Sequence, residues 1–214
     1  MQKLLSHEKL LHVQQVHEGF EIVLGWESRN KYRILNESMQ PVAYAAEIST
    51  GIRGAIMRQF FGHWRRFDVT IFNQDRKAEF FLNFPFRFFF KTLFVKDSKG
   101  TDVGKLEQRF AIFRKKFDIF DRYHQKIGRI NSSFFRFWTF DIYSPTGMKI
   151  ASIKKRWSGV FSEVFTDKDN FVVEYYSSEL GEEARAMILS TCIMVDIIYF
   201  ENNQGGGSVL NIFD

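Results

Sequence analysis

The stretch that decides the fold is Ala184-Arg-Ala-Met-Ile-Leu-Ser-Thr-Cys-Ile-Met-Val-Asp-Ile-Ile-Tyr-Phe200. Its uncharged part, residues 186–195, is about half of the roughly 20 apolar residues that a membrane-spanning helix requires. Asp196 follows inside the same stretch, and a carboxylate at the centre of a bilayer costs about 2.5–3.5 kcal/mol on insertion scales. A helix that is apolar on nearly every side but too short to span is typical of a buried helix. We therefore predict a helix enclosed by the rest of the protein rather than a membrane anchor.

The rest of the chain predicts a container for this helix, because short alternating strands recur along it. An apolar or aromatic residue opens each strand, a polar turn follows, and a second alternating strand completes a hairpin. A further strand begins at Asn170, and residues 10–26 supply at least one more. Five such hairpins are recognised, at residues 32–46, 67–82, 93–106, 117–130 and 140–153.

About twelve strands of this kind favour a closed antiparallel barrel, since closure leaves no strand edge unpaired. Such a barrel has a wider bore than the eight-stranded barrels that side chains alone can fill. The sequence therefore predicts a mostly β fold: a closed antiparallel barrel of about twelve strands that encloses the hydrophobic C-terminal α-helix.

Length and composition are consistent with one domain. The chain has 214 residues, of which 45% are hydrophobic and only three are proline. We expect the barrel domain at residues 1–203, its central helix at about 182–200, and a flexible tail at 204–214. Cys192 is the single cysteine, so no intramolecular disulfide is possible. Polar residues 6–9 interrupt the apolar start, so we recognise no secretory signal and expect the protein inside the cell.

Conventional catalytic motifs are absent from the sequence. His7, His12 and His17 are five residues apart, which does not place them on one helical face, and no acidic pair or cysteine completes a metal site. Gly100-Thr-Asp-Val-Gly-Lys105 is one residue short of a phosphate-binding loop and fits a hairpin turn instead. No Gly-x-Ser-x-Gly motif occurs. We therefore expect no conventional enzyme.

Phenylalanine and basic residues cluster in the connections between hairpins. Between residues 80 and 94, eight of the 26 phenylalanines accompany Arg87 and Lys91, with no acidic residue among them. Comparable mixtures occupy residues 51–66, 109–116 and 134–138. In an up-and-down barrel, connections of one class lie at one end. The sequence thus predicts one rim rich in Phe and Arg, typical of an interfacial membrane site, and a polar rim opposite.

Two segments of the chain resemble the phospholipid scramblase family. One is residues 155–171, which begin Lys-Arg-Trp-Ser-Gly-Val-Phe, followed by the helix at 187–201; the other is the opening hairpin, with Asn30-Lys-Tyr-Arg-Ile-Leu-Asn36 and Ala43-Tyr-Ala-Ala-Glu47. The similarity covers about residues 10–201, and the chain looks like a short member of prokaryotic type. The resemblance implies the Tubby-like, LURP-one-related fold, a twelve-stranded barrel around a buried C-terminal helix. It also implies calcium-stimulated, energy-independent movement of phospholipids between leaflets.

The resemblance also indicates membrane-contacting residues. Animal members carry acylated cysteines in connections that correspond to residues 51–66, 84–90 and 132–138, where this chain has Phe, Ile, Met and Trp. We infer that these side chains take the place of acyl chains and that neighbouring basic residues attract anionic lipid. The predicted membrane-facing residues are Phe60, Phe61, Trp64, Arg65, Arg66, Phe86, Arg87, Phe88, Phe89, Phe90 and Lys91.

Calcium is the one cofactor that the resemblance implies. The family's proposed calcium segment corresponds to residues 167–178, where Asp167 and Asp169 are the candidate ligands. The segment departs from an EF-hand loop, because Val172 stands where glycine is required and Ser178 where the bidentate glutamate is required. Two interpretations remain open: a calcium site, or a turn whose carboxylates accept backbone hydrogen bonds.

Three functional hypotheses follow from these patterns. The first is a scramblase-like protein that acts on or binds phospholipids, anionic ones above all, as a peripheral protein at the inner face of the plasma membrane. The second is a non-catalytic lipid-binding or adaptor module. The third is nucleic-acid binding, suggested by a sequence pI near 9.3 and by basic residues among aromatics. The excess of Phe over Tyr and Trp suits hydrocarbon better than base stacking, so we expect no nucleic-acid partner.

Overall fold

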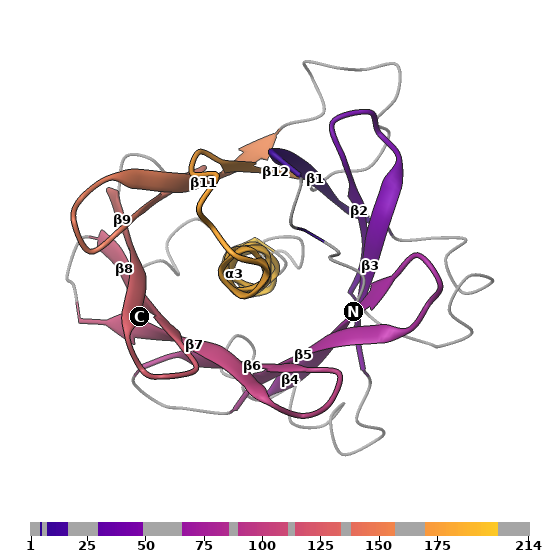
Figure 1. Cartoon of the computed structure of the whole chain (residues 1–214), viewed down its shortest axis with the longest axis horizontal. Helices are drawn as coiled ribbons and strands as arrows, with labels where there is room; N and C mark the ends of the chain where they lie inside the picture. Colours follow the sequence, from indigo (N-terminus) through magenta and orange to yellow (C-terminus); the bar gives the residue numbers. More distant parts are fainter. Residues whose placement is uncertain are drawn as a thin grey trace.

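The computed structural model describes residue 5 and residues 8–16, 30–48, 66–85, 90–110, 114–133, 138–156 and 170–200. Within them, twelve antiparallel strands form one closed barrel, and the helix α3 (Glu182–Tyr199) runs along its axis (Figure 1). Each strand pairs with its neighbours in the chain, and β1 closes the ring by pairing with β12, with Leu11 opposite Val173. This arrangement confirms the predicted fold class.

The strand bounds follow the predicted hairpins closely. They are β1 (Leu10–Gln15), β2 (Lys31–Leu35), β3 (Pro41–Glu47), β4 (Phe67–Asn73), β5 (Ala78–Phe84), β6 (Thr92–Asp97), β7 (Asp102–Arg109), β8 (Arg114–Asp121), β9 (Lys126–Ser133), β10 (Thr139–Tyr143), β11 (Lys149–Arg156) and β12 (Asn170–Tyr175).

One predicted connection, at residues 109–116, is wrong at both of its ends. Arg109 still belongs to β7 and pairs with Lys116, and β8 begins at Arg114, which pairs with Ser133. The run Arg114-Lys-Lys shows no apolar alternation, so the sequence pattern did not indicate a strand there. Pairing with two neighbouring strands extends the ladder regardless of that local preference.

The core is the contact between the inner wall of the barrel and α3. Alternation along the strands directs residues such as Leu11, Val13, Phe140 and Ile142 inward, where they are buried. Every residue of α3 from Arg185 to Ile198 is buried, which means that the helix is covered on all faces, as predicted. No helix in the described parts of the chain combines the length and apolarity needed to cross a bilayer.

Gly104 on β7 allows the helix to come close to the wall. A Cβ atom at this position would lie 3.1 Å from the Met187 Sδ atom of α3 and 2.2 Å from the backbone oxygen of Phe120 on β8. The second distance is impossible for a real side chain, so only glycine fits there.

Polar groups of α3 have specific partners in the wall. The Tyr32 hydroxyl donates a hydrogen bond of 2.8 Å to the buried carboxylate of Asp196. At the other end of the helix, the Arg185 side chain donates to the carbonyl oxygens of Leu180 and Glu8 and stacks 4.6 Å from the centre of the Tyr175 ring. Asp196, which argued against a membrane anchor, and Arg185 are thus both accommodated inside the barrel.

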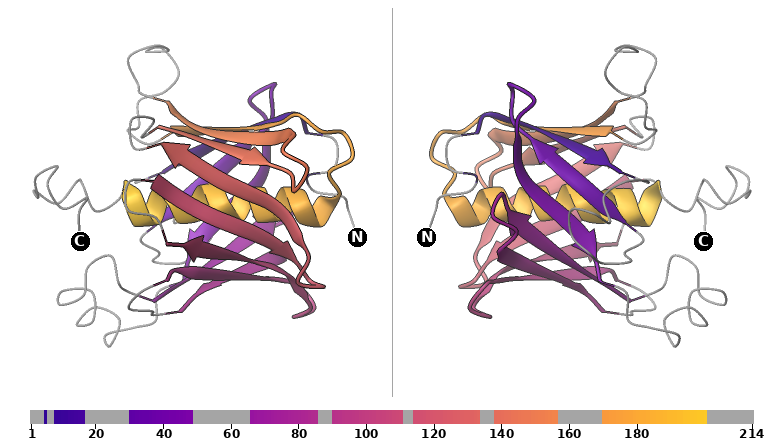
Figure 2. Two further views of the ribbon diagram at one scale, coloured as in Figure 1. Left: turned by 90° about the vertical axis from the view of Figure 1, so that its left-hand side faces the viewer. Right: turned by 90° about the vertical axis from the view of Figure 1, so that its right-hand side faces the viewer.

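The two ends of the barrel differ in construction. At one end, where α3 begins, tight turns join the two strands of each hairpin; we name it the turn rim. At the opposite end, where α3 finishes, lie the strand ends that flank the longer connections; we name it the mouth rim (Figure 2). The predicted gathering of one class of connection at one end is therefore confirmed for the strand ends that the structure describes.

Candidate functional site

The structure describes three of the eleven predicted membrane-facing residues. Arg66 precedes β4, and Phe90 and Lys91 precede β6, so all three lie at the mouth rim. The remaining eight, Phe60, Phe61, Trp64, Arg65, Phe86, Arg87, Phe88 and Phe89, lie outside the described residues.

Large hydrophobic side chains are exposed at four strand ends of the mouth rim. Their exposed fractions are 39% for Ile48 after β3, 49% for Phe90 before β6, 75% for Phe110 after β7 and 38% for Trp138 before β10. These residues come from four separate connections, yet the fold brings them to the same end of the barrel.

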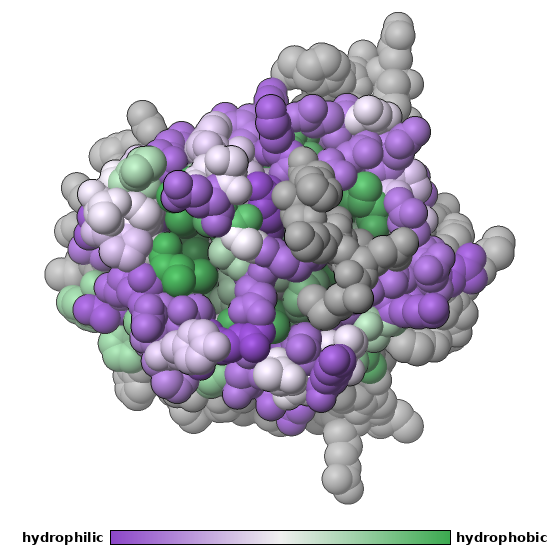
Figure 3. All heavy atoms as spheres, viewed as in Figure 1, coloured by the Kyte–Doolittle hydropathy of each residue, from purple (hydrophilic) through white to green (hydrophobic). Residues whose placement is uncertain are grey.

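The turn rim presents a different surface. Figure 3 looks onto this end and shows mainly hydrophilic residues around the rim, with hydrophobic ones toward the middle. Its exposed large hydrophobic residues are Tyr123, Met148 and Tyr176, and two of these carry a hydroxyl group. Among the described residues, exposed phenylalanine at a rim is thus confined to the mouth.

The end of α3 forms an aromatic cluster at the mouth. Phe200 stacks on Trp138 at 5.3 Å between ring centres and lies 5.5 Å from Phe171, and Tyr199 lies 6.5 Å from Phe140. The cluster joins the end of the helix to β10, to Trp138 just before it, and to β12.

Two lysines complete this cluster, which we name the mouth cluster: Lys91, Trp138, Phe140, Lys155, Phe171, Tyr199 and Phe200. Lys155 places its Nζ atom 3.9 Å from the centre of the Phe200 ring, and Lys91 places its Nζ atom 5.3 Å from that of Tyr199. The last turn of α3 has no basic residue of its own, so these lysines bring positive charge to the negative end of the helix dipole. Burial lowers the pKa of Lys91 to about 8.

A buried chain of polar side chains lies at the mouth ends of β1, β2 and β3. The Gln15 amide donates to Asn30 at 2.9 Å, and the Asn30 amide donates to the Glu47 carboxylate at 2.7 Å. All three residues are less than 5% exposed, so the chain fastens these strand ends together. Asn30 and Glu47 belong to the hairpin segments that carried the family resemblance, and the structure gives them a structural role.

Sequence reasoning missed Lys155 and the helix residues Tyr199 and Phe200 as parts of the mouth, whereas Trp138 lies in the predicted rim segment 134–138. Lys155 lies between Lys154 and Arg156 and shares the inward face of its strand with Ile153, and that alternation was the one available signal. Asp167 and Asp169 lie outside the described residues, and no group of three or more possible metal ligands occurs within the part that is described.

A family model named Scramblase matches residues 1–202. The chain belongs to the scramblase family. Altered inheritance rate of mitochondria protein 25 of Saccharomyces cerevisiae is 25% identical over 95% of this chain and 74% of its own length. Phospholipid scramblase 2 of Bos taurus is 26% identical over 96% of this chain and 72% of its own, and phospholipid scramblase 1 of Homo sapiens is 25% identical over 94% and 66%.

The chain therefore spans about two thirds to three quarters of the length of these scramblase relatives. A protein from Arabidopsis thaliana of known X-ray structure aligns with a TM-score of 0.48 and 11% identity, over 87% of this chain and 90% of the other. The barrel itself is established by the strand pairing within this chain.

Proposed function

We propose that this scramblase-family protein is a peripheral phospholipid-binding protein that docks its mouth rim on the inner face of the plasma membrane. The observation that carries the proposal is the exposure of Ile48, Phe90, Phe110 and Trp138 at four strand ends of one rim. Scattered exposed apolar residues are ordinary, but a group at one end of the molecule is typical of a binding surface.

Charge at the same rim favours anionic phospholipid. Arg66 and Lys91 lie at strand ends beside the exposed hydrophobic residues, and the whole chain carries a formal net charge of +5. A fully inserted phenylalanine contributes about 1.5–3 kcal/mol, and a basic residue near an anionic surface adds about 1 kcal/mol. Several of each are sufficient for attachment without an acyl chain.

We further propose that the protein moves lipid between leaflets without energy input or a covalent catalytic step, as the names of its relatives suggest. The bore is filled by α3, whose residues from Arg185 to Ile198 are buried. A headgroup that crosses the bilayer with the help of this protein would therefore pass along the outer surface of the barrel and not through it.

The docking surface is tested with two matched double variants. Phe90→Ser/Phe110→Ser removes exposed rings from the mouth rim, and Tyr123→Ser/Met148→Ser removes comparable side chains from the turn rim. In co-sedimentation with phosphatidylserine-containing liposomes, the first variant should lose binding and the second should keep it, with thermal melts like wild type for both. Equal binding by the two variants would contradict the proposal.

Lipid movement is tested separately by reconstitution into liposomes with a fluorescent phospholipid. Addition of dithionite quenches the outer leaflet, and faster loss of the protected inner fraction than in protein-free liposomes would support lipid movement. Binding without any acceleration would leave a lipid-binding module and refute the scrambling step.

A further inference from the structure

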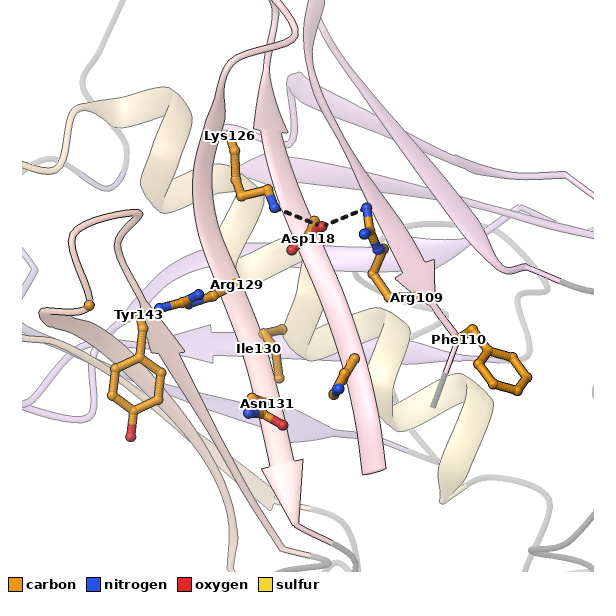
Figure 4. A pocket seen from close by; sticks show the side chains of 10 residues that line it. Arg109, Phe110, Asp118, Lys126, Arg129, Ile130, Asn131 and Tyr143 are labelled. Carbon is orange, nitrogen blue, oxygen red and sulfur yellow. Dashed lines mark ion pairs between the residues drawn. The ribbon is translucent and has the colours of Figure 1, made fainter. Parts of the chain in front are cut away.

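A basic cavity of about 670 Å³ lies on the outer flank of the barrel, over β7 to β10 (Figure 4). Arg109, Lys116, Lys126 and Arg129 line it, and Asp118 is its one acidic residue. Two of these cations, Arg109 and Lys116, come from the segment that the sequence pattern assigned to a rim connection. Their place in strands puts them on the flank, where the predicted membrane rim does not account for them.

The negative charge of Asp118 is already balanced by two neighbouring cations. Its Oδ2 atom lies 3.0 Å from the Lys126 Nζ atom and 3.2 Å from the Arg109 Nη1 atom, and its side chain is 9% exposed (Figure 4). The carboxylate therefore acts as an anchor that holds two cations at the cavity and leaves the group with a net positive charge.

Arg129 and Lys116 are the two cations of the cavity that do not pair with Asp118. Arg129 lies opposite Asp118 on the neighbouring strand and opposite Tyr143 on the next, toward which Figure 4 shows it pointing. Lys116 is two residues before Asp118 on β8 and therefore shares its face of the sheet. Neither side chain forms an ion pair or hydrogen bond with another residue in the described parts of the chain.

Asp118 balances only one of the four positive charges around this cavity, so a bound anion would reduce the repulsion that remains between the cations. A guanidinium fork and an ammonium group suit the oxygens of a phosphate, and the Asn131 amide at the same cavity offers a neutral hydrogen bond. A volume of about 670 Å³ is in the range of small-molecule sites and exceeds what a bare ion fills.

The basic surface stops at β7. Glu107 lies opposite Asp118 and pairs with Lys105 at 2.7 Å, so the row of cations does not continue around the barrel. A nucleic-acid strand requires a longer basic track with several stacking rings, and the cavity is lined by only two rings, those of Phe110 and Tyr143. The dimensions fit a small phosphate ester.

We propose that this cavity binds a phosphate monoester, with Arg129 and Lys116 as its principal contacts and Asp118 as the residue that positions Arg109 and Lys126. The phosphate belongs either to a soluble ester or to the headgroup of a lipid such as phosphatidic acid. Arg109 and Phe110 lie at the mouth end of the cavity, within reach of a membrane at that rim. The site goes beyond the docking proposed above and does not depend on it.

The experiment compares two variants with the same change in charge. Arg129→Gln/Lys116→Gln removes the unpaired cations, and Lys77→Gln/Lys99→Gln removes two exposed lysines from the turn rim. Glycerol 3-phosphate is titrated into ¹⁵N-labelled protein, with glycerol in matched chloride as the blank. We expect the Arg129 side-chain and Asn131 signals to shift, affinity to fall about a hundredfold in the cavity variant, and a change of less than about threefold in the control.

Vesicles identify the source of the phosphate. If the soluble ester binds as expected, the site accepts free phosphate esters. If only vesicles of phosphatidylcholine with phosphatidic acid bind, and Arg129→Gln/Lys116→Gln abolishes that binding, the ligand is a lipid headgroup. If the cavity variant and the control behave alike in both assays while remaining folded, the cavity is not a binding site and the proposal fails.

The docking proposal can fail independently of this site. Ile48→Ser/Phe90→Ser alters the mouth rim outside the cavity, and it should retain binding of glycerol 3-phosphate whatever its effect on vesicle attachment. Loss of ester binding in this folded variant would overturn the assignment to the flank.

Discussion

Five hairpin turns at the turn rim share one construction at the level of single residues. In each, the first residue has a side-chain oxygen that accepts backbone N–H groups within the turn, as Asp97 does from Lys99 at 2.9 Å and Thr101 at 2.8 Å. The fourth residue has a positive φ, and the strand pairing shifts by one residue beside every turn. These fourth residues are Met39, Arg76, Gly100, His124 and Gly147.

Glycine at the fourth turn position should raise the free energy of unfolding by a measurable amount. Gly100 has φ of 82°, and a Cβ atom added to it would meet no other atom within 4 Å, so Gly100→Ala changes backbone strain alone. We expect the free energy of unfolding to fall by about 1 kcal/mol in chemical denaturation. His124→Gly, at φ of 61°, should shift it in the opposite direction. If Gly100→Ala lowers the free energy of unfolding by no more than the neighbouring Lys99→Ala does, backbone strain at Gly100 does not contribute to stability.

Lys91 gives a second prediction at this scale, concerning pH. Its pKa in the folded protein is lowered from 10.5 to about 8 by burial, so between these values the unfolded chain binds more protons than the folded one. Stability should therefore rise with pH across that window, relative to a Lys91→Met variant that lacks the group. The stability gap between variant and wild type, measured in urea, should be largest below about pH 8 and shrink toward pH 10.5. Lys96→Met, at an exposed lysine, is the matched control for the change of residue type.

Calcium should bind weakly or not at all at Asp167 and Asp169. The later positions of this segment lack the ligands of an EF-hand, and Phe171 to Tyr175 belong to β12 and are therefore extended. Isothermal titration calorimetry should detect no high-affinity site. A sub-micromolar site that disappears in Asp167→Ala would establish the calcium switch that the family resemblance implies.

At the scale of secondary-structure elements, α3 is the component on which the barrel depends. Leu189 is fully buried in the middle of the helix, so Leu189→Ala should lower the free energy of unfolding by about 2–5 kcal/mol. Leu189→Asp should prevent folding, because it buries a charge. Glu179→Ala, at an exposed site before the helix, serves as the control in thermal melts.

Truncation after Glu183 tests whether α3 is a buried core helix or a membrane anchor. Removal of α3 leaves the inner wall of the barrel without its packing partner, so the truncated chain should lose its cooperative melting transition. A truncated chain that melts like wild type and loses only membrane attachment would show that the helix is an anchor.

The barrel and its plug could be predicted because their signals are local. Alternating burial and polar turn residues mark the strands, and the short apolar run with Asp196 marks an enclosed helix. The extension of β8 to Arg114 left no such signal, since pairing with β7 and β9 sets it. Lys91 and Trp138 lie in predicted rim segments, but their grouping with Lys155 and Phe200 left no signal. These residues are far apart in the sequence and come together only when the ring closes around α3.

At the scale of the whole molecule, the two ends of the barrel give it a direction. Hydrophobic side chains and the end of α3 mark the mouth, while hydrophilic turns mark the opposite rim (Figures 2 and 3). A protein that docks by one end presents the other end and its flanks to the surrounding solution. This orientation would leave the flank cavity accessible beside the membrane.

Attachment should therefore depend on both hydrophobic insertion and charge. Arg65→Glu/Arg66→Glu should weaken flotation mainly with anionic liposomes at low salt, since charges further apart than about 10 Å are screened at 0.1 M. Phe90→Ser/Phe110→Ser should weaken it at every salt concentration. If the arginine pair binds like wild type in both salt conditions, charge does not contribute to attachment.

The closure of β1 on β12 has a consequence for how the chain is made. β1 cannot pair with β12 until β12 has been synthesised, and α3, which fills the interior, is translated after both strands. While the ribosome is still adding residues, the nascent chain is an unclosed sheet with two free edges and an uncovered apolar face. Folding of the barrel is thus expected to finish late and slowly, because it depends on contacts between distant parts of the sequence. Until the ring closes, the exposed apolar face is available for chaperones to bind.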